Sequence, residues 1–91
     1  MSLVWVTNYT NTNITVQITA KTNGDASVFT LDPKAVQTRD ANGWFRKGTE
    51  TATIVVGNKK KVLNVEPNDH INVYVDRVER TVSKEFLEYD K

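Results

Sequence analysis

The sequence contains no cysteine and only one histidine, His70. Without cysteine the chain can form no disulfide, has no thiol nucleophile and cannot build the usual zinc sites. A serine triad would have to use His70, and none of the serines lies in a Gly-x-Ser-x-Gly sequence. Asp69 directly precedes His70 in a turn, so we interpret this histidine as the first residue of the next strand. We therefore predict that the protein is not an enzyme and needs no cofactor.

Metal-binding and phosphate-binding sequences are also missing. Asp25, Asp32, Asn68 and Asp69 supply oxygens of the kind that calcium prefers. Calcium loops, however, place carboxylates at alternate positions before a bidentate glutamate, and no such run occurs here. The chain also has no glycine-rich phosphate loop. The sequence accordingly predicts no metal site.

Long apolar runs and strong charge are missing as well. No apolar run approaches the roughly 20 residues that cross a bilayer, and the first residues do not resemble a signal peptide. We expect a cytoplasmic protein that is not transmembrane. The 12 basic and 11 acidic residues give a net charge of +1. The two signs interleave, as in Asp76-Arg77-Val78-Glu79-Arg80, which argues against a nucleic-acid partner.

What the sequence does contain is a period of two. From Ile14 to Lys21 apolar and polar residues alternate, which is typical of a strand with one buried face. Turn residues separate such runs: Asn23-Gly24 and Gly57-Asn58 favour hairpins, and Pro33 and Pro67 fix φ in the other turns. The pattern predicts strands over residues 3–8, 13–21, 26–31, 35–40, 50–56, 60–65, 71–76 and 78–84. The tail from Ser83 to Tyr89 is the only segment whose sequence is compatible with a short helical turn.

Seven or eight short strands with polar outer faces predict an all-β fold, an antiparallel β-sandwich, over a single domain spanning residues 1–91. A small β-barrel is the runner-up. We do not expect a parallel sheet, because no spacer is long enough for a helical crossover. The predicted core comprises Leu3, Trp5, Ile14, Val16, Ile18, Phe29, Leu31, Ile54, Val56, Val62, Val65, Ile71, Val73 and Val75.

The segment from Ala41 to Glu50 carries the clearest functional signal. It places Trp44 and Phe45 side by side, followed by Arg46 and Lys47. In a strand the two aromatic residues point to opposite faces, so at most one enters the core. An exposed ring beside cations suits a sugar, a lipid interface or a protein partner. We predict a ligand-binding loop of Trp44, Phe45, Arg46 and Lys47. The structural alternative is that Trp44 caps the sandwich and Arg46 stacks on it.

A second basic cluster, Lys59-Lys60-Lys61, lies at a predicted hairpin tip. Lysines at such a tip are usually solvated and discourage pairing between sheet edges. If the cluster lay near Arg46 and Lys47, it would instead form a basic patch able to meet an anionic membrane.

Two sequences carry a resemblance to a known group. They are Val4-Trp5-Val6-Thr7-Asn8-x-Thr10 and Trp44-Phe45-Arg46-x-Gly48-x-Glu50. They resemble short cytosolic β-sandwich proteins of mushroom-forming fungi, and the architecture is more distantly similar to aegerolysins and fruit-body lectins. The resemblance implies a non-catalytic protein that binds a glycan or a lipid surface.

A structural or protein-interaction module is the alternative function. A homodimer is an expected assembly, because so small a domain has no disulfide or structural metal to stabilise it. The strand from Leu3 to Val6 is apolar on both faces. Such a strand either lies centrally or packs its second face against the tail residues Phe86, Leu87 and Tyr89 or against a second protomer. We predict that the tail or a twofold partner takes part in its burial. Deleting residues 1–6 is predicted to abolish folding.

Overall fold

The computed structural model describes residues 3–20, 26–33, 43–81 and 85–90 of the chain. These residues form short strands, and none of them is helical. The strands are β1 (Leu3–Asn8), β2 (Ile14–Ile18), β3 (Phe29–Leu31), β4 (Gly43–Phe45), β5 (Glu50–Val56), β6 (Lys59–Val65), β7 (His70–Val73), β8 (Val78–Arg80) and β9 (Glu85–Leu87).

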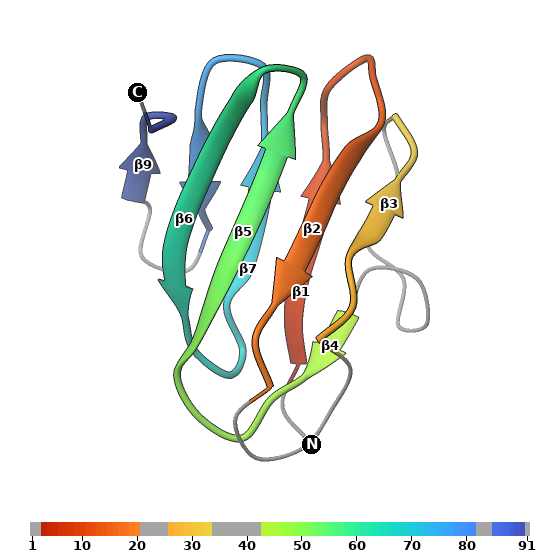
Figure 1. Cartoon of the computed structure of the whole chain (residues 1–91). Coiled ribbons are helices and arrows are strands. Elements are labelled where there is room, and N and C mark those ends of the chain that lie inside the picture. Colours follow the sequence, from red (N-terminus) through yellow and green to blue (C-terminus); the bar gives the residue numbers. More distant parts are fainter. Residues whose placement is uncertain (1–2, 21–25, 34–42, 82–84, 91) are drawn as a thin grey trace.

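The strands build two stacked sheets. The five-stranded sheet has the order β4-β1-β7-β8-β9, and the four-stranded sheet has the order β3-β2-β5-β6. In Figure 1 the four-stranded sheet lies in front of the five-stranded sheet. Neither sheet closes on itself, so the structure confirms the predicted β-sandwich rather than the barrel.

The sequence located most strands but not all of their ends. Residues 3–8 and 50–56 have the predicted bounds, whereas β7 and β8 are shorter than expected. The predicted strand at 35–40 lies outside the described residues. Residues 43–45, expected in a turn, form β4, and residues 85–87 form β9 instead of a helical turn. No helix in the described part of the chain is long and apolar enough to span a membrane.

The sheets are antiparallel, as expected, except for one parallel pair. β1 pairs with β7 in parallel, with Val6 opposite Ile71 and Asn8 opposite Val73. The prediction assumed that a parallel pair requires a helical crossover. Here the chain between the two strands passes through the other sheet, so the sandwich itself supplies the crossover.

Two predicted turns adopt backbone conformations that few residues tolerate. Gly57 has a φ of 60° at the hairpin between β5 and β6, as its lack of a Cβ atom allows. Asn68 has a φ of 76° one position after Pro67, and the Asp69 amide donates to the Glu66 carbonyl at 3.0 Å. This arrangement matches a type II turn with proline and asparagine at its centre.

The core lies between the sheets and follows the alternation of the strands. β5 shows it clearly, since every second residue from Glu50 to Val56 is buried. The structure confirms the predicted core positions Ile14, Val16, Ile18, Leu31, Ile54, Val56, Val65, Ile71 and Val73. It adds Val4, Val6, Trp44, Ala52, Leu63 and Val78.

Other core predictions were wrong. On β1 the buried residues are Val4 and Val6, whereas Leu3 and Trp5 face outward and are half-buried. Both sets are apolar, so the alternation of apolar and polar residues cannot show which face of β1 is buried. The prediction placed Trp5, the larger side chain, in the core. Phe29, Val62 and Val75 are exposed.

β1 lies centrally, between β4 and β7, which is the first of the arrangements considered for this strand. The prediction that the tail takes part in burying this strand is wrong, because β9 pairs with β8 at the far edge of the same sheet. The β1 side chains that face inward, Val4 and Val6, are fully buried. The strand is therefore integral to the core.

Candidate binding face

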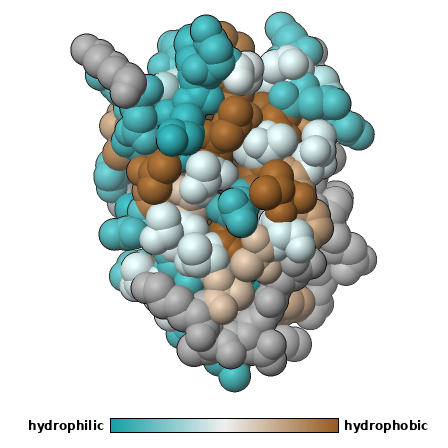
Figure 2. All heavy atoms as spheres, in the orientation of Figure 1, coloured by the Kyte–Doolittle hydropathy of each residue, from teal (hydrophilic) through white to brown (hydrophobic). Residues whose placement is uncertain are grey.

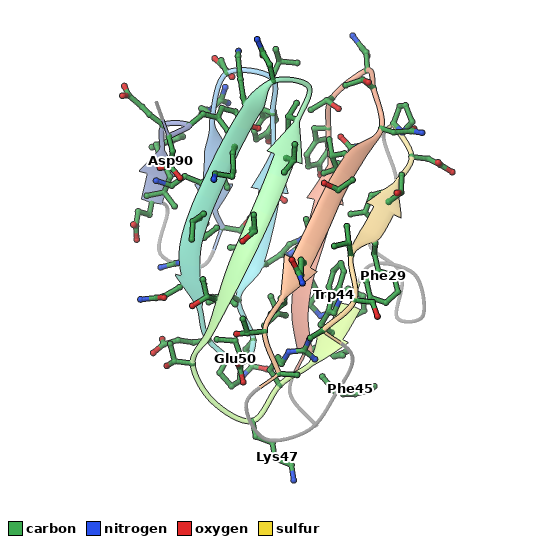
Figure 3. The ribbon with its side chains drawn as sticks, viewed as in Figure 1. Phe29, Trp44, Phe45, Lys47, Glu50 and Asp90 are labelled. Carbon is green, nitrogen blue, oxygen red and sulfur yellow. The ribbon has the colours of Figure 1, made fainter. Side chains whose placement is uncertain are left out.

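The predicted loop of aromatic and basic residues divides between two environments. Trp44 is buried and meets Phe29 edge to face, with ring centroids 5.8 Å apart. Phe45, the next residue, is exposed, as the alternation of a strand requires. Figure 3 shows Trp44 beside Phe29, with Phe45 and Lys47 directed away from the sandwich. Phe45 and Lys47 therefore face solvent.

Arg46 points inward and connects the two sheets. Only 4% of its surface is exposed, and its guanidinium donates to the carbonyls of Thr19 at 2.9 Å and Ile18 at 3.0 Å. It also donates to the Phe45 carbonyl at 2.7 Å. Arg46 thus satisfies backbone oxygens at the end of β2 from a position just after β4. Its contacts are those of a structural residue.

Glu50 is the second charged residue buried at this end of the molecule. Its Oε1 accepts a hydrogen bond from the Thr19 hydroxyl at 2.6 Å. The Thr19 oxygen in turn accepts from the Thr51 amide at 2.9 Å. These contacts fasten the end of β2 to the start of β5, and they add to the link that Arg46 makes.

The two basic clusters do not meet. Lys59 pairs with Val56, the last residue of β5, whereas Lys47 precedes Glu50, its first residue. Seven residues of extended chain span about 20 Å, so the clusters lie at opposite ends of the four-stranded sheet. The condition for a joint basic patch is not met.

Two lysines of β6, Lys59 and Lys61, lie beside the C-terminal tail. Lys61 Nζ lies 3.2 Å from Asp90 Oδ1. Lys59 Nζ donates to the Val75 carbonyl at 3.2 Å and lies 5.9 Å from the centre of the Tyr89 ring. The positive charge of this cluster is therefore partly balanced within the molecule.

The outer face of the five-stranded sheet carries a set of aromatic and polar side chains that the sequence did not predict to lie together. Alternation and register place one set of side chains there, because Leu3 lies opposite Phe45, Trp5 opposite His70 and Thr7 opposite Asn72. Glu79 lies opposite Asn72 and Phe86 opposite Glu79. We call this surface the aromatic face, and it comprises Leu3, Trp5, Thr7, Tyr9, Phe45, His70, Asn72, Tyr74, Arg77, Glu79 and Phe86.

One end of the aromatic face is a continuous stack. The rings of Tyr9 and Tyr74 lie 5.2 Å apart and 9° from parallel. The Arg77 guanidinium lies 4.3 Å from the Tyr74 ring centre and 5.9 Å from that of Phe86. Tyr9 and Phe86 remain 51% and 66% exposed. The stack therefore presents two accessible rings around a cation held by aromatic contacts.

Carboxylates compensate the charge of this stack. Arg77 contacts Asp76 at 2.8 Å and Glu79 at 3.1 Å. The pKa of the Tyr74 phenol is raised, mainly by desolvation and then by the negative charge of Glu79. Both effects favour the protonated form of Tyr74.

The middle of the aromatic face holds a tryptophan above a glycine. Trp5 lies opposite Gly43, and a Cβ atom at Gly43 would come 3.0 Å from the Trp5 ring. Glycine at this position lets the ring lie close to the backbone. Along β1, Trp5 and Tyr9 are four residues apart, about 13 Å.

Polar groups lie between the rings. His70 Nε2 is 3.4 Å from the Thr7 hydroxyl, and desolvation lowers the pKa of His70, which favours its neutral form. Asn72 Nδ2 donates to the Thr81 hydroxyl at 2.7 Å. Asn72 Oδ1 is buried and has no hydrogen-bond partner among the described residues. The face thus combines aromatic surface with fixed donors and acceptors.

The opposite outer face differs in kind. On the four-stranded sheet the outward residues of the strands include Thr15, Gln17, Thr53 and Val62. None of the outward strand residues described there is aromatic. Figure 2 looks onto this side and shows hydrophobic residues scattered among neutral and hydrophilic ones.

A signal for the aromatic face was present in the sequence. Trp5 and Tyr9 are four residues apart, as are His70 and Tyr74, so each pair lies on one face of an extended strand. Assigning Trp5 to the core hid the pattern, and the parallel pairing of β1 with β7 could not be deduced from alternation. The juxtaposition of Arg77 and Phe86 depends on β9, which the sequence did not predict.

The described residues include no group of three or more histidine, cysteine or carboxylate side chains that could hold a metal ion. His70 begins β7, as interpreted from the sequence. Comparison with known proteins found no match to any protein-family model, curated protein or solved structure.

Proposed function

We propose that this protein is a non-catalytic binding module and that its aromatic face binds a glycan. The observation that carries the proposal is the pair of exposed rings, Tyr9 and Phe86, on a sheet face that also presents fixed polar groups. A sugar ring has an apolar face that packs on aromatic rings and hydroxyl groups that need donors and acceptors. The aromatic face supplies both in one plane.

The charges favour a neutral glycan over an anionic membrane. Membrane binding of this kind relies on several uncompensated cations close to the surface. Arg77, the described cation on the aromatic face, contacts two carboxylates. Lys61 contacts Asp90 at a different edge of the molecule.

The predicted loop contributes to this surface in part. Phe45 lies opposite Leu3 and continues the aromatic face toward Lys47. Trp44 and Arg46 support the loop from inside. We therefore propose contact roles for Phe45 and Lys47, with Trp44 and Arg46 holding the loop in place.

Co-sedimentation with chitin, cellulose and β-1,3-glucan tests the proposal, with neutral and anionic vesicles in parallel. We expect the wild-type protein to be retained by at least one polysaccharide. Tyr9→Ala and Phe86→Ala should each weaken retention about tenfold, the scale of one aromatic contact. Val62→Thr, at an exposed position on the opposite outer face, is the matched control and should leave retention unchanged.

Binding to vesicles alone would contradict the proposal and favour a lipid ligand. Retention on a polysaccharide that neither Tyr9→Ala nor Phe86→Ala reduces would place the binding surface elsewhere.

A further inference from the structure

β6 lies at the edge of the four-stranded sheet and pairs with β5 on one side. The other side of an edge strand presents backbone N–H and C=O groups that can pair with a further strand. On β6 these groups belong to alternate residues, among them Lys60, Val62 and Asn64. Each of these three contributes a hydrogen bond to a group outside the sheet.

The C-terminal tail occupies the first part of this edge. The Asp90 amide donates to the Lys60 carbonyl at 2.7 Å. The Asp90 carboxylate accepts from the Val62 amide at 2.9 Å and lies 3.2 Å from Lys61 Nζ. These contacts lower the pKa of Asp90, with the Val62 amide the largest cause. Figure 3 shows Asp90 beside β6.

Arg80 occupies the next position along the same edge. Its guanidinium donates to the Asn64 carbonyl and also contacts Glu85 at 3.5 Å. Arg80 belongs to β8 in the other sheet. Successive outward positions of β6 are therefore held by polar groups from the C-terminal part of the chain.

The tail is held by limited contacts. β9 is three residues long, and Glu85, Phe86, Glu88 and Asp90 are all exposed. Its anchors in the interior are Leu87 and Tyr89, which are only partly buried. Such a segment opens at low free-energy cost compared with the central strands.

The edge beneath the tail is complementary to itself. If two copies of β6 pair antiparallel about Val62, Lys60 of each copy lies opposite Asn64 of the other. The exposed Val62 side chains then meet each other, and no lysine lies directly opposite a lysine. The outward backbone groups pair reciprocally, as a twofold interface requires.

We propose that the β6 edge is a self-association surface that the tail keeps closed through Asp90, and that the partner it fits is β6 of a second copy. Loss of the Asp90 carboxylate frees the Val62 amide at the centre of the edge, and the second copy then displaces the Asp90 amide from the Lys60 carbonyl and Arg80 from the Asn64 carbonyl. The wild-type chain, with its edge closed, remains a monomer.

Light scattering after size exclusion, from micromolar to near-millimolar protein, tests this proposal together with hydrogen exchange of the Val62 amide. In full-length Asp90→Ala we expect exchange at Val62 to accelerate about tenfold or more and the apparent mass to double at high concentration. Glu88→Ala, an exposed carboxylate on the same tail, should change neither. Adding Val62→Pro to Asp90→Ala removes the central donor at an edge position that tolerates proline, and should restore the monomer.

Each alternative result would overturn the proposal. A Val62 amide that stays protected in Asp90→Ala would show that the tail is not the cover. A monomeric Asp90→Ala with a freely exchanging Val62 amide would show that the uncovered edge does not self-associate. Dimers that persist with Val62→Pro, or that form equally in Glu88→Ala, would place association elsewhere.

Discussion

Asn8 shows how a single side chain can organise a connection between strands. Its side chain is fully buried, and the carbonyls of Thr12, Leu31 and Asp32, at 2.9 to 3.1 Å, share the two hydrogens of its Nδ2. Its Oδ1 accepts from the Thr10 amide at 2.9 Å. One amide therefore joins the β1–β2 connection to the end of β3.

Replacing Asn8 with alanine should lower the free energy of unfolding by about 3 kcal/mol, because buried carbonyls would lose their donor. Urea unfolding monitored by tryptophan fluorescence would measure the loss. Asn11→Ala, in the same connection but exposed, is the control and should cost under about 0.5 kcal/mol. Equal losses in the two variants would contradict this role for Asn8.

The sequence predicts Arg46 as a ligand-binding residue, and in the structure its guanidinium lies buried against backbone carbonyls. Its guanidinium spans carbonyls that a lysine ammonium cannot reach in the same fork geometry. Arg46→Lys should therefore lower the free energy of unfolding by about 2 kcal/mol. Lys47→Ala, at the exposed neighbour, should be close to neutral. A neutral Arg46→Lys would show that the inward hydrogen bonds contribute little.

At the scale of elements, β1 is the strand on which the five-stranded sheet depends. It pairs with β4 on one side and with β7 on the other. Deleting residues 1–6 would remove Val4 and Val6 from the core and separate β4 from the sheet. We expect the truncated chain to show no cooperative unfolding transition by circular dichroism. A retained transition would contradict the central place of β1.

The tail depends on Tyr89. Burial, and then the negative charge of Asp76, raises the pKa of Tyr89 to about 12, and its hydroxyl donates to the Tyr74 carbonyl at 2.5 Å. Because this folded-state pKa lies above the unfolded value of 10, the contribution of Tyr89 to stability is complete below pH 10. It is lost as the pH rises toward 12.

Absorbance at an ultraviolet wavelength specific for phenolate, followed against pH, would test this. We expect a late-titrating component that Tyr89→Phe removes, and loss of Val62 amide protection over the same range as the tail detaches. Titration of all three tyrosines together near pH 10 would contradict the burial of Tyr89.

Alternation predicted the elements well where one face of a strand is apolar and the other polar. β2 and β5 follow this alternation. Their inward apolar residues are Ile14, Val16 and Ile18 on β2 and Ala52, Ile54 and Val56 on β5. Alternation failed on β1, where both faces are apolar. Packing against the rest of the molecule decides which face of β1 is buried. β4 and β9 are too short for a periodic signal, and both were missed.

At the scale of the whole molecule, the stacking of the two sheets decides which predicted residues can meet. It separates Lys47 from Lys59 by the length of β5 and brings Tyr9 to Tyr74 through the parallel pair β1–β7. Such contacts between distant segments have no counterpart in local sequence. The fungal resemblance and the cytoplasmic location stay predictions.

The two surfaces of the molecule have separate roles in this proposal. The aromatic face lies on the outer side of the five-stranded sheet, whereas the β6 edge, which the tail covers, belongs to the four-stranded sheet. Self-association through β6 would extend the four-stranded sheet at that edge. Tyr9→Ala, which lies outside the tail, should therefore weaken glycan binding and leave self-association unchanged.

Titration of the ¹⁵N-labelled protein with soluble oligosaccharides of chitin, cellulose and β-1,3-glucan tests the aromatic face most directly. We predict chemical-shift changes at the Trp5 indole and at the amides of Tyr9, Asn72 and Phe86, with Thr15 and Thr53 on the opposite face unaffected. The absence of shifts with every oligosaccharide, or shifts confined to the face of Thr15 and Thr53, would contradict a glycan-binding aromatic face.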